Sequence, residues 1–145
     1  MGQYRWNDNR EVVMNKEIEE FLKAKAFGVV GASTDRHKYG NKVLRCYQQH
    51  GLKAVPVNPK VPEIEGAKSV ASVLDLPAEV ESISVITPPA VTEQVVAQAA
   101  EKGIRNVWMQ PGAESQRAVA ICREHGINVI ADGSCLLVVL GYRDH

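Results

Sequence analysis

Short apolar segments alternate with longer amphipathic segments along most of this chain, and this alternation restricts its fold more than any other feature. The apolar segments have the length of a buried strand, and each is followed by polar residues, glycine or proline. The amphipathic segments carry apolar residues at helical spacing, and several of them end in glycine. Alternating strands and helices predict right-handed βαβ units, and therefore a parallel sheet with helices on both faces.

The expected elements follow from this pattern. Strands are predicted at residues 26–31, 52–57, 82–87, 106–110 and 127–131. Helices are predicted to start at Asn15 and end near Lys25, and to end at Gly51, Gly103 and Gly126. Residues 58–68 are expected to form a loop, residues 72–76 one helical turn, and residues 136–140 an apolar closing segment of either type. The prediction is one α/β domain, a doubly wound, Rossmann-like parallel sheet over residues 15–145, preceded by a flexible arm at residues 1–14.

The composition excludes several classes of protein. The chain carries 17 basic and 17 acidic residues, so it lacks the basic surplus of a nucleic-acid-binding protein. No segment approaches the roughly 18–20 apolar residues that a membrane-spanning helix needs, and the first residues lack the apolar core of a secretory signal. A length of 145 residues is also too short for a dehydrogenase with separate cofactor and substrate domains.

The reactive side chains are scattered. Cys46, Cys122 and Cys135 are far apart and form no metal-binding pattern with histidine, which is typical of reduced thiols in a cytoplasmic protein. Cys135 has no histidine near it in the sequence, so we expect an inert thiol rather than a nucleophile. The nucleophile elbow of hydrolases and the P-loop of ATPases are both missing. We therefore predict no catalytic residues and no metal site, and any chemistry would have to happen within this one small domain or be completed by a partner.

The end of the first strand is the strongest candidate for a ligand site, because ligands of such sheets bind beyond the carboxyl ends of the strands. Gly31 permits a sharp turn there, and Ala32, Ser33 and Thr34 lead towards a helix whose first N–H groups could bind phosphate. The next glycine, Gly40, is nine residues away, so this is not the dinucleotide-binding fingerprint. A plain structural turn is the alternative interpretation.

Cations and an amide extend this candidate site. Arg36 and Lys38 lie in the same loop and favour an anion, although a short basic run can also be merely solvated. The second strand ends in Asn58, Pro59 and Lys60, where an NAD-binding domain would carry an acidic residue for the ribose hydroxyls. An amide and a lysine suit a phosphate on the ribose better. We expect these cations to gather at one edge of the sheet.

Two further strand ends carry candidate residues. Thr87 and Pro88 follow the third strand, and a proline there either packs against an adenine or simply ends the strand. Gln110, Pro111 and Gly112 follow the fourth strand, where the glycine could expose N–H groups to a ligand. Trp108 and Met109, just before them, are expected to serve the core.

Five short segments carry a resemblance to a known family. They are residues 30–33, 55–60, 73–77 and 108–112, and Asp132 with Cys135. In this order they resemble the small single-domain CoA-binding proteins, a family similar to the N-terminal CoA-binding domain of the succinyl-CoA synthetase alpha subunit. The resemblance runs from about residue 18 to residue 140, nearly the whole chain. That family often has arginine directly before the cysteine, where this chain has Ser134.

The resemblance implies a Rossmann-type domain that holds CoA at the carboxyl edge of its sheet. Residues 31–33 would then contact the phosphate-bearing part of CoA, and Lys60 would face a phosphate of the nucleotide. Residues 87–88 would lie beside the adenine, and residues 110–112 would line the pantetheine. The phosphohistidine of the synthetase belongs to a second domain, which has no counterpart in these 145 residues.

Three functional hypotheses follow. The leading one is binding of CoA or acyl-CoA without catalysis by this chain. The alternatives are an NAD(P)-binding oxidoreductase or redox sensor, and a protein-interaction subunit with a vestigial nucleotide site. The expected ligand is thus a small molecule rather than a nucleic acid or a membrane, and a protein partner remains open.

Overall fold

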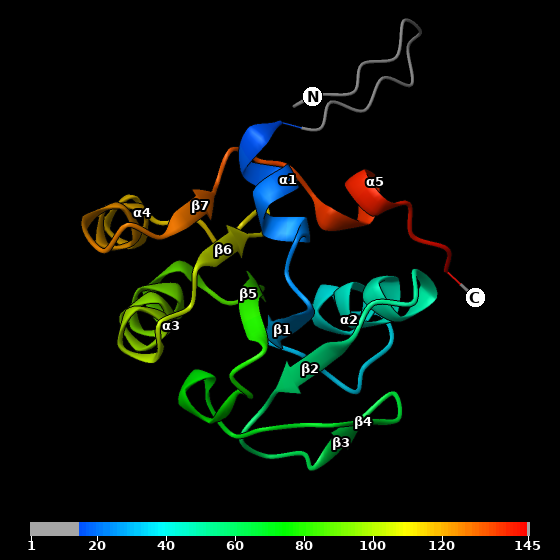
Figure 1. The fold of residues 1–145 in the computed structure, drawn as a ribbon. Coiled ribbons are helices and arrows are strands. Elements are labelled where there is room, and N and C mark those ends of the chain that lie inside the picture. Colours follow the sequence, from blue (N-terminus) through cyan, green and yellow to red (C-terminus); the bar gives the residue numbers. More distant parts are fainter. Residues whose placement is uncertain (1–14, 145) are drawn as a thin grey trace, which may run out of the picture.

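A five-stranded parallel sheet forms the centre of the computed structural model, which describes residues 15–144 of the chain (Figure 1). The predicted flexible arm, residues 1–14, lies outside the described residues. The strands are β1 (Ala26–Val30), β2 (Ala54–Val57), β5 (Val80–Val85), β6 (Asn106–Met109) and β7 (Asn128–Ile130). Their order in the sheet is β2-β1-β5-β6-β7, and each neighbouring pair is parallel. The predicted doubly wound, Rossmann-like α/β fold is therefore confirmed.

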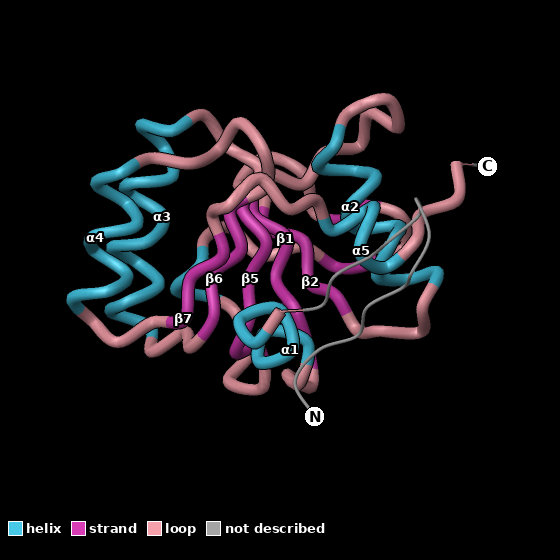
Figure 2. The backbone as a smooth tube through the Cα atoms, turned by 90° about the horizontal axis from the view of Figure 1, so that it is seen from above, coloured by secondary structure: helices cyan, strands magenta, loops and turns pink. Residues whose placement is uncertain are grey.

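Helices cover both faces of this sheet (Figure 2). They are α1 (Lys16–Leu22), α2 (Tyr39–Gln49), α3 (Pro89–Lys102), α4 (Gln116–Glu124) and α5 (Leu136–Leu140), with a short 3₁₀ helix, η1, at Val73–Asp75. Residues of α1, α2 and α5 pack on one face, and residues of α3, α4 and η1 pack on the other. Asn15 caps α1 as predicted, since its side chain accepts a hydrogen bond from the N–H of Ile18 at 2.8 Å.

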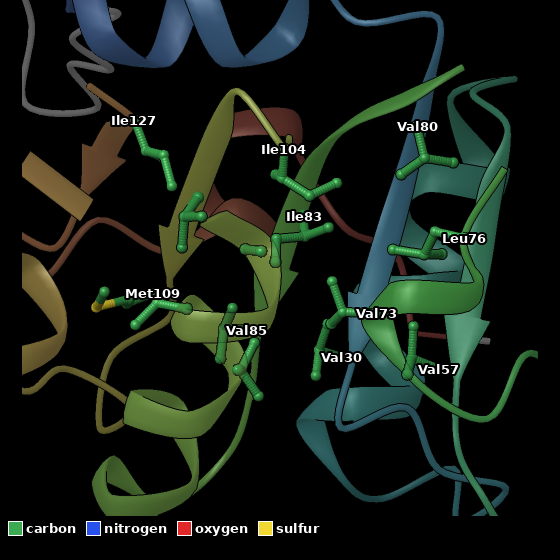
Figure 3. Packing of buried hydrophobic residues seen from close by; sticks show 14 of the residues in the cluster. Val30, Val57, Val73, Leu76, Val80, Ile83, Val85, Ile104, Met109 and Ile127 are labelled. Atoms are coloured by element: carbon green, nitrogen blue, oxygen red, sulfur yellow. The ribbon is translucent and has the colours of Figure 1, made fainter. Parts of the chain in front are cut away.

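The alternation of side chains along each strand divides the apolar residues between two cores. Phe27 and Trp108 point towards α1 and α2. Val30, Val85 and Met109 point towards α3, α4 and η1, in the core that Figure 3 shows. Trp108 and Met109 are completely buried, which confirms their predicted place in the core.

Some of the predicted element boundaries are wrong. The first helix ends at Leu22 rather than near Lys25, and the third strand is Val80–Val85 rather than residues 82–87. The expected loop at residues 58–68 contains an antiparallel hairpin of two short strands, β3 (Glu63–Ile64) and β4 (Ala67–Lys68). Strands of two residues are too short to show an alternating pattern, so periodicity could not reveal them.

Beyond β2, the chain adds one more parallel contact to the edge of the sheet. Val70 forms an isolated parallel bridge with Val57, and its N–H donates to the carbonyl of Pro56 at 3.0 Å. Pro56 has no N–H, and it faces this outer edge, where little pairing is required. The bridge occupies the position of a further strand. With this bridge, the strand order is that of the nucleotide-binding Rossmann sheet. In that sheet, strands are added outward from β1 in one direction and then, starting with β5, in the other.

A buried hydrogen bond joins α2 to the middle of the sheet. The hydroxyl of Tyr47 lies 2.6 Å from Oγ of Ser84 on β5, and both residues are completely buried. The Tyr47 ring also stacks on Phe27, with 4.7 Å between the ring centroids. Burial raises the pKa of the Tyr47 hydroxyl far above its usual value, so this hydroxyl remains protonated and able to donate.

Replacing Tyr47 by phenylalanine should lower the free energy of unfolding by about 1–3 kcal/mol, because the Ser84 hydroxyl would be left buried without its partner. The double variant Tyr47→Phe with Ser84→Ala should be more stable than Tyr47→Phe alone, since both polar groups are then gone. Urea denaturation measures both effects. Tyr39→Phe removes the hydroxyl of an exposed tyrosine and serves as the control. Equal stabilities of Tyr47→Phe and the unsubstituted protein would contradict this account.

Candidate functional site

A cavity of about 760 Å³ lies at the carboxyl ends of β1, β2 and β5, at the point between β1 and β5 where the strand order reverses. Its size is within the usual range of ligand pockets, about 300–1,000 Å³. The predicted site residues that line it are Gly31, Ala32, Ser33, Lys38, Asn58, Pro59 and Thr87. Three neighbouring strand ends therefore contribute to one cavity.

Two glycines allow the loop after β1 to pass very close to the sheet and to α2. Gly31 has a φ of +95°, and a Cβ there would lie 2.1 Å from the carbonyl oxygen of Ile86. Gly40, in the first turn of α2, is equally restricted, since its Cβ would lie 2.0 Å from the carbonyl oxygen of Gly31. Eight residues separate these two glycines in the sequence. Folding brings them into contact and places the start of α2 directly beside the end of β1.

Two asparagines fix the direction of the peptide groups in this loop. Nδ2 of Asn58 donates to the carbonyl of Ala32 at 3.0 Å, and Nδ2 of Asn41 donates to the carbonyl of Ser33 at 2.9 Å. In a trans peptide the N–H points opposite to the C=O, so the N–H groups of Ser33 and Thr34 face away from these amides. Within residues 15–144, no group accepts a hydrogen bond from either N–H. The loop thus offers two backbone donors to a ligand.

Asn58 also shapes the turn after β2. Its Oδ1 accepts hydrogen bonds from the N–H groups of Lys60 and Val61, at 2.8 and 3.2 Å. Because its Nδ2 binds Ala32, this side chain ties the ends of β1 and β2 together. Asn58 was expected to donate to a ligand, whereas its side chain forms hydrogen bonds with Ala32, Lys60 and Val61.

The three candidate cations differ in their surroundings. Lys38 lines the cavity at the start of α2. Arg36 is paired with Glu65, with 3.2 Å between Nε and Oε2. Lys60 is exposed and does not line the cavity, although the preceding residue, Pro59, does. Only Lys38 therefore contacts the cavity directly.

The residues after β6 lie outside the lining of this cavity. Gln110 is buried, and its Oε1 accepts a hydrogen bond from the N–H of Leu136 at 3.0 Å. Its Nε2 has no partner among the described residues. Pro111 and Gly112 are exposed, and the N–H of Gly112 donates to the carboxylate of Glu114. Thr34 and Pro88 are also exposed and are not part of the lining.

Sequence reasoning missed the wall that α3 contributes. Val91, Gln94, Val95 and Gln98 line the cavity from α3, and Ala71, Ser72 and Val73 line it from η1 and the turn before it. The spacing of the α3 residues by three or four positions is that of one helix face. That helix face follows directly after the predicted strand end at Thr87. This position in the sequence could have indicated that α3 lines the site.

The thiols do not form part of a reactive cluster. Burial raises the pKa of Cys46 and of Cys122 to about 11, so both thiols remain protonated at neutral pH. Cys135 is half-buried. Residues 15–144 contain no group of histidines, cysteines or carboxylates that could hold a metal ion. None of the helices in this part of the chain is long and apolar enough to cross a membrane.

Comparison with known proteins gives a consistent result. Residues 25–140 match the family model described as a CoA binding domain. The chain is 28% identical over 124 residues to the alpha subunit of an ADP-forming acetate–CoA ligase II from Pyrococcus furiosus, with 78% of this chain and 27% of that subunit covered. It thus spans about a quarter of that relative. It is also 28% identical to the uncharacterized protein YneT of Bacillus subtilis, with 80% of this chain and 87% of YneT covered.

Solved structures show the same similarity. A conserved hypothetical protein from Pyrococcus furiosus superposes with a TM-score of 0.75 at 38% identity, with 79% of this chain and 97% of that chain covered. A hypothetical protein from Pyrococcus horikoshii superposes with a TM-score of 0.78 at 32% identity, with coverage of 83% and 84%. Both neighbours are close to this chain in size, unlike the ligase subunit.

The tight contact at Gly40 can be tested by the direction in which Gly40→Ala changes the stability of the protein. Helix propensity alone favours alanine over glycine by about 1 kcal/mol, so Gly40→Ala should then stabilise the protein. The clash with the Gly31 carbonyl instead predicts a loss of about 1–3 kcal/mol and a lower Tm in thermal unfolding. Gly103→Ala is the comparison variant, because a Cβ there would meet nothing within 4 Å, so any loss of stability comes from its positive φ of 88° and not from a clash. A Gly40→Ala variant as stable as the parent would disprove the close approach.

Proposed function

Because this chain belongs to the CoA-binding domain family, we propose that it binds CoA or an acyl-CoA at the carboxyl edge of its sheet and does not itself catalyse a reaction. The observation that carries the proposal is the loop after β1, whose N–H groups at Ser33 and Thr34 have no acceptor within residues 15–144. Ser33 lines a cavity that is large enough for part of such a ligand, and the exposed Thr34 follows it in the chain.

The phosphates of CoA suit this loop. Lys38 precedes the first turn of α2 and makes no capping hydrogen bond with its side chain. Within residues 15–144, no group accepts a hydrogen bond from the N–H of Tyr39 or Gly40, so these two donors are available to an anion. The ammonium group of Lys38 adds a positive charge in the same place. Gly31 and Gly40 keep side chains away from the path of the loop, so the backbone itself can approach the phosphates.

The adenine and the pantetheine suit the walls of the cavity. Val57, Val73 and Ile86 contribute apolar surface to the lining, and Thr87 follows the end of β5, where we place the adenine. Residues 110–112 lie beyond the cavity, at the end of the neighbouring strand β6. We propose that the pantetheine leaves the cavity in their direction, since β5 and β6 are adjacent in the sheet.

Lys60 is proposed to contact the 3′-phosphate of CoA. Its backbone is held by Asn58 at the end of β2, while its side chain is exposed beside the mouth of the cavity. A lysine at this position attracts a phosphate, whereas the acidic residue of NAD-binding domains would repel it. The lysine therefore favours CoA over NAD as the ligand.

The biological context is also a proposal. The matched region covers only 27% of the ligase subunit from Pyrococcus furiosus, so most of that subunit has no counterpart in this match. We propose that this chain corresponds to the CoA-holding part alone, works in the cytoplasm, and delivers or senses CoA for a protein partner.

Isothermal titration should show saturable binding of CoA and about five- to tenfold weaker binding of dephospho-CoA, because one charge-assisted contact contributes about 1–1.4 kcal/mol. Lys60→Gln should abolish this difference. Lys25→Gln removes the same charge from an exposed residue before β1, at the opposite edge of the sheet, and should leave both affinities unchanged.

Other outcomes would favour the competing hypotheses. Tighter binding of NADPH than of CoA would favour an oxidoreductase or redox sensor. Absence of binding to any nucleotide, together with co-purification of a fixed protein partner, would favour an interaction subunit with a vestigial site.

A further inference from the structure

Glu65 has an unusual backbone conformation. Among residues 15–144 it is the only residue other than glycine with a positive φ, at 50°. Glu65 and Gly66 form the two-residue turn between β3 and β4, a position that favours asparagine or glycine because both residues must adopt positive φ. A glutamate in this conformation is unexpected on local grounds, and such outliers often reflect a functional constraint.

The side chain of Glu65 reaches the loop after β1. Its Oε2 accepts a hydrogen bond from Nδ2 of Asn41 at 2.9 Å and one from Nε of Arg36 at 3.2 Å. Its backbone carbonyl accepts a further hydrogen bond from Gln48 on α2 at 3.1 Å. The hairpin is thereby tied both to the first helix turn of α2 and to the loop that borders the cavity.

Asn41 transmits this contact to the candidate phosphate site. It is completely buried, and its second Nδ2 proton goes to the carbonyl of Ser33 at 2.9 Å. Its Oδ1 accepts from Nε of Arg45 at 2.7 Å, and since arginine can only donate, the orientation of the amide is fixed. The Ser33 carbonyl is held in turn, and with it the direction of the Thr34 N–H on the other side of the same peptide.

We infer that Glu65 is a positioning residue for the phosphate site: through Asn41 it holds the peptide between Ser33 and Thr34 so that its N–H faces the ligand. This inference rests on the proposed binding of CoA. Glu65 also holds Arg36 in the same loop. A carboxylate near an anion site would weaken binding by its charge, so its contribution must come from geometry.

Two neutral variants separate geometry from charge. Glu65→Gln keeps an oxygen that can reach Asn41, whereas Glu65→Asn is too short to do so but is well suited to positive φ. We expect CoA to bind Glu65→Gln within about threefold of the unsubstituted protein, and Glu65→Asn about tenfold more weakly. Relief of the strain at positive φ opposes the loss of the hydrogen bond to Asn41, so the Tm of Glu65→Asn should change little. Titration calorimetry and thermal unfolding of the full chain provide both values.

Glu63→Gln is the matched control, because it removes the same charge from an exposed residue of the same hairpin and should leave CoA affinity unchanged. Tighter binding by both Glu65 variants would show that Glu65 acts only through its charge, and equal binding by both would show that it has no part in the site; either result would overturn the inference. A lower Tm of Glu65→Asn with unchanged affinity would make Glu65 purely structural and would also overturn it. If the unsubstituted protein does not bind CoA, the proposed function fails and this inference fails with it.

Discussion

The close approach of three backbone segments is the constraint on which the site depends. The loop after β1 passes between the end of β5 and the start of α2 at distances that leave no room for a Cβ at Gly31 or Gly40. This contact brings the amino end of α2 to the carboxyl end of β1, beside the point where the strand order of the sheet reverses. A bulkier residue at either glycine would separate the helix from the strand, and the N–H groups that we assign to phosphate would no longer converge.

The fold could be predicted from the sequence because its signals are local and repeated. Each of the five strands is a short apolar run, and the caps at Asn15 and Gly103 mark where helices begin and end. The hairpin at residues 63–68 could not be predicted in this way. Its two-residue strands carry no periodicity, and the turn at Glu65 contradicts the usual residue preference. Contacts with α2, distant in the sequence, hold it in place.

The candidate site was predictable only in part, because some of its contacts join residues that are distant in the sequence. The position at the ends of β1, β2 and β5 follows from a general rule of parallel sheets, and Gly31, Ser33 and Lys38 could be named from it. The hydrogen bonds of Asn41 to Ser33 and Glu65 span 8 and 24 residues, and no local pattern announces them. Which cation faces the cavity also depends on folding, since Arg36 is engaged by Glu65.

The central claim is that the backbone N–H groups after β1 receive the phosphates of CoA. Two-dimensional ¹H–¹⁵N NMR of the labelled protein, recorded during titration with CoA, tests this most directly. Our account predicts that the amide signals of Ser33, Thr34 and the first turn of α2 shift most, and that they saturate together. Saturable binding whose largest shifts fall elsewhere, such as along α4 and β7, would contradict it.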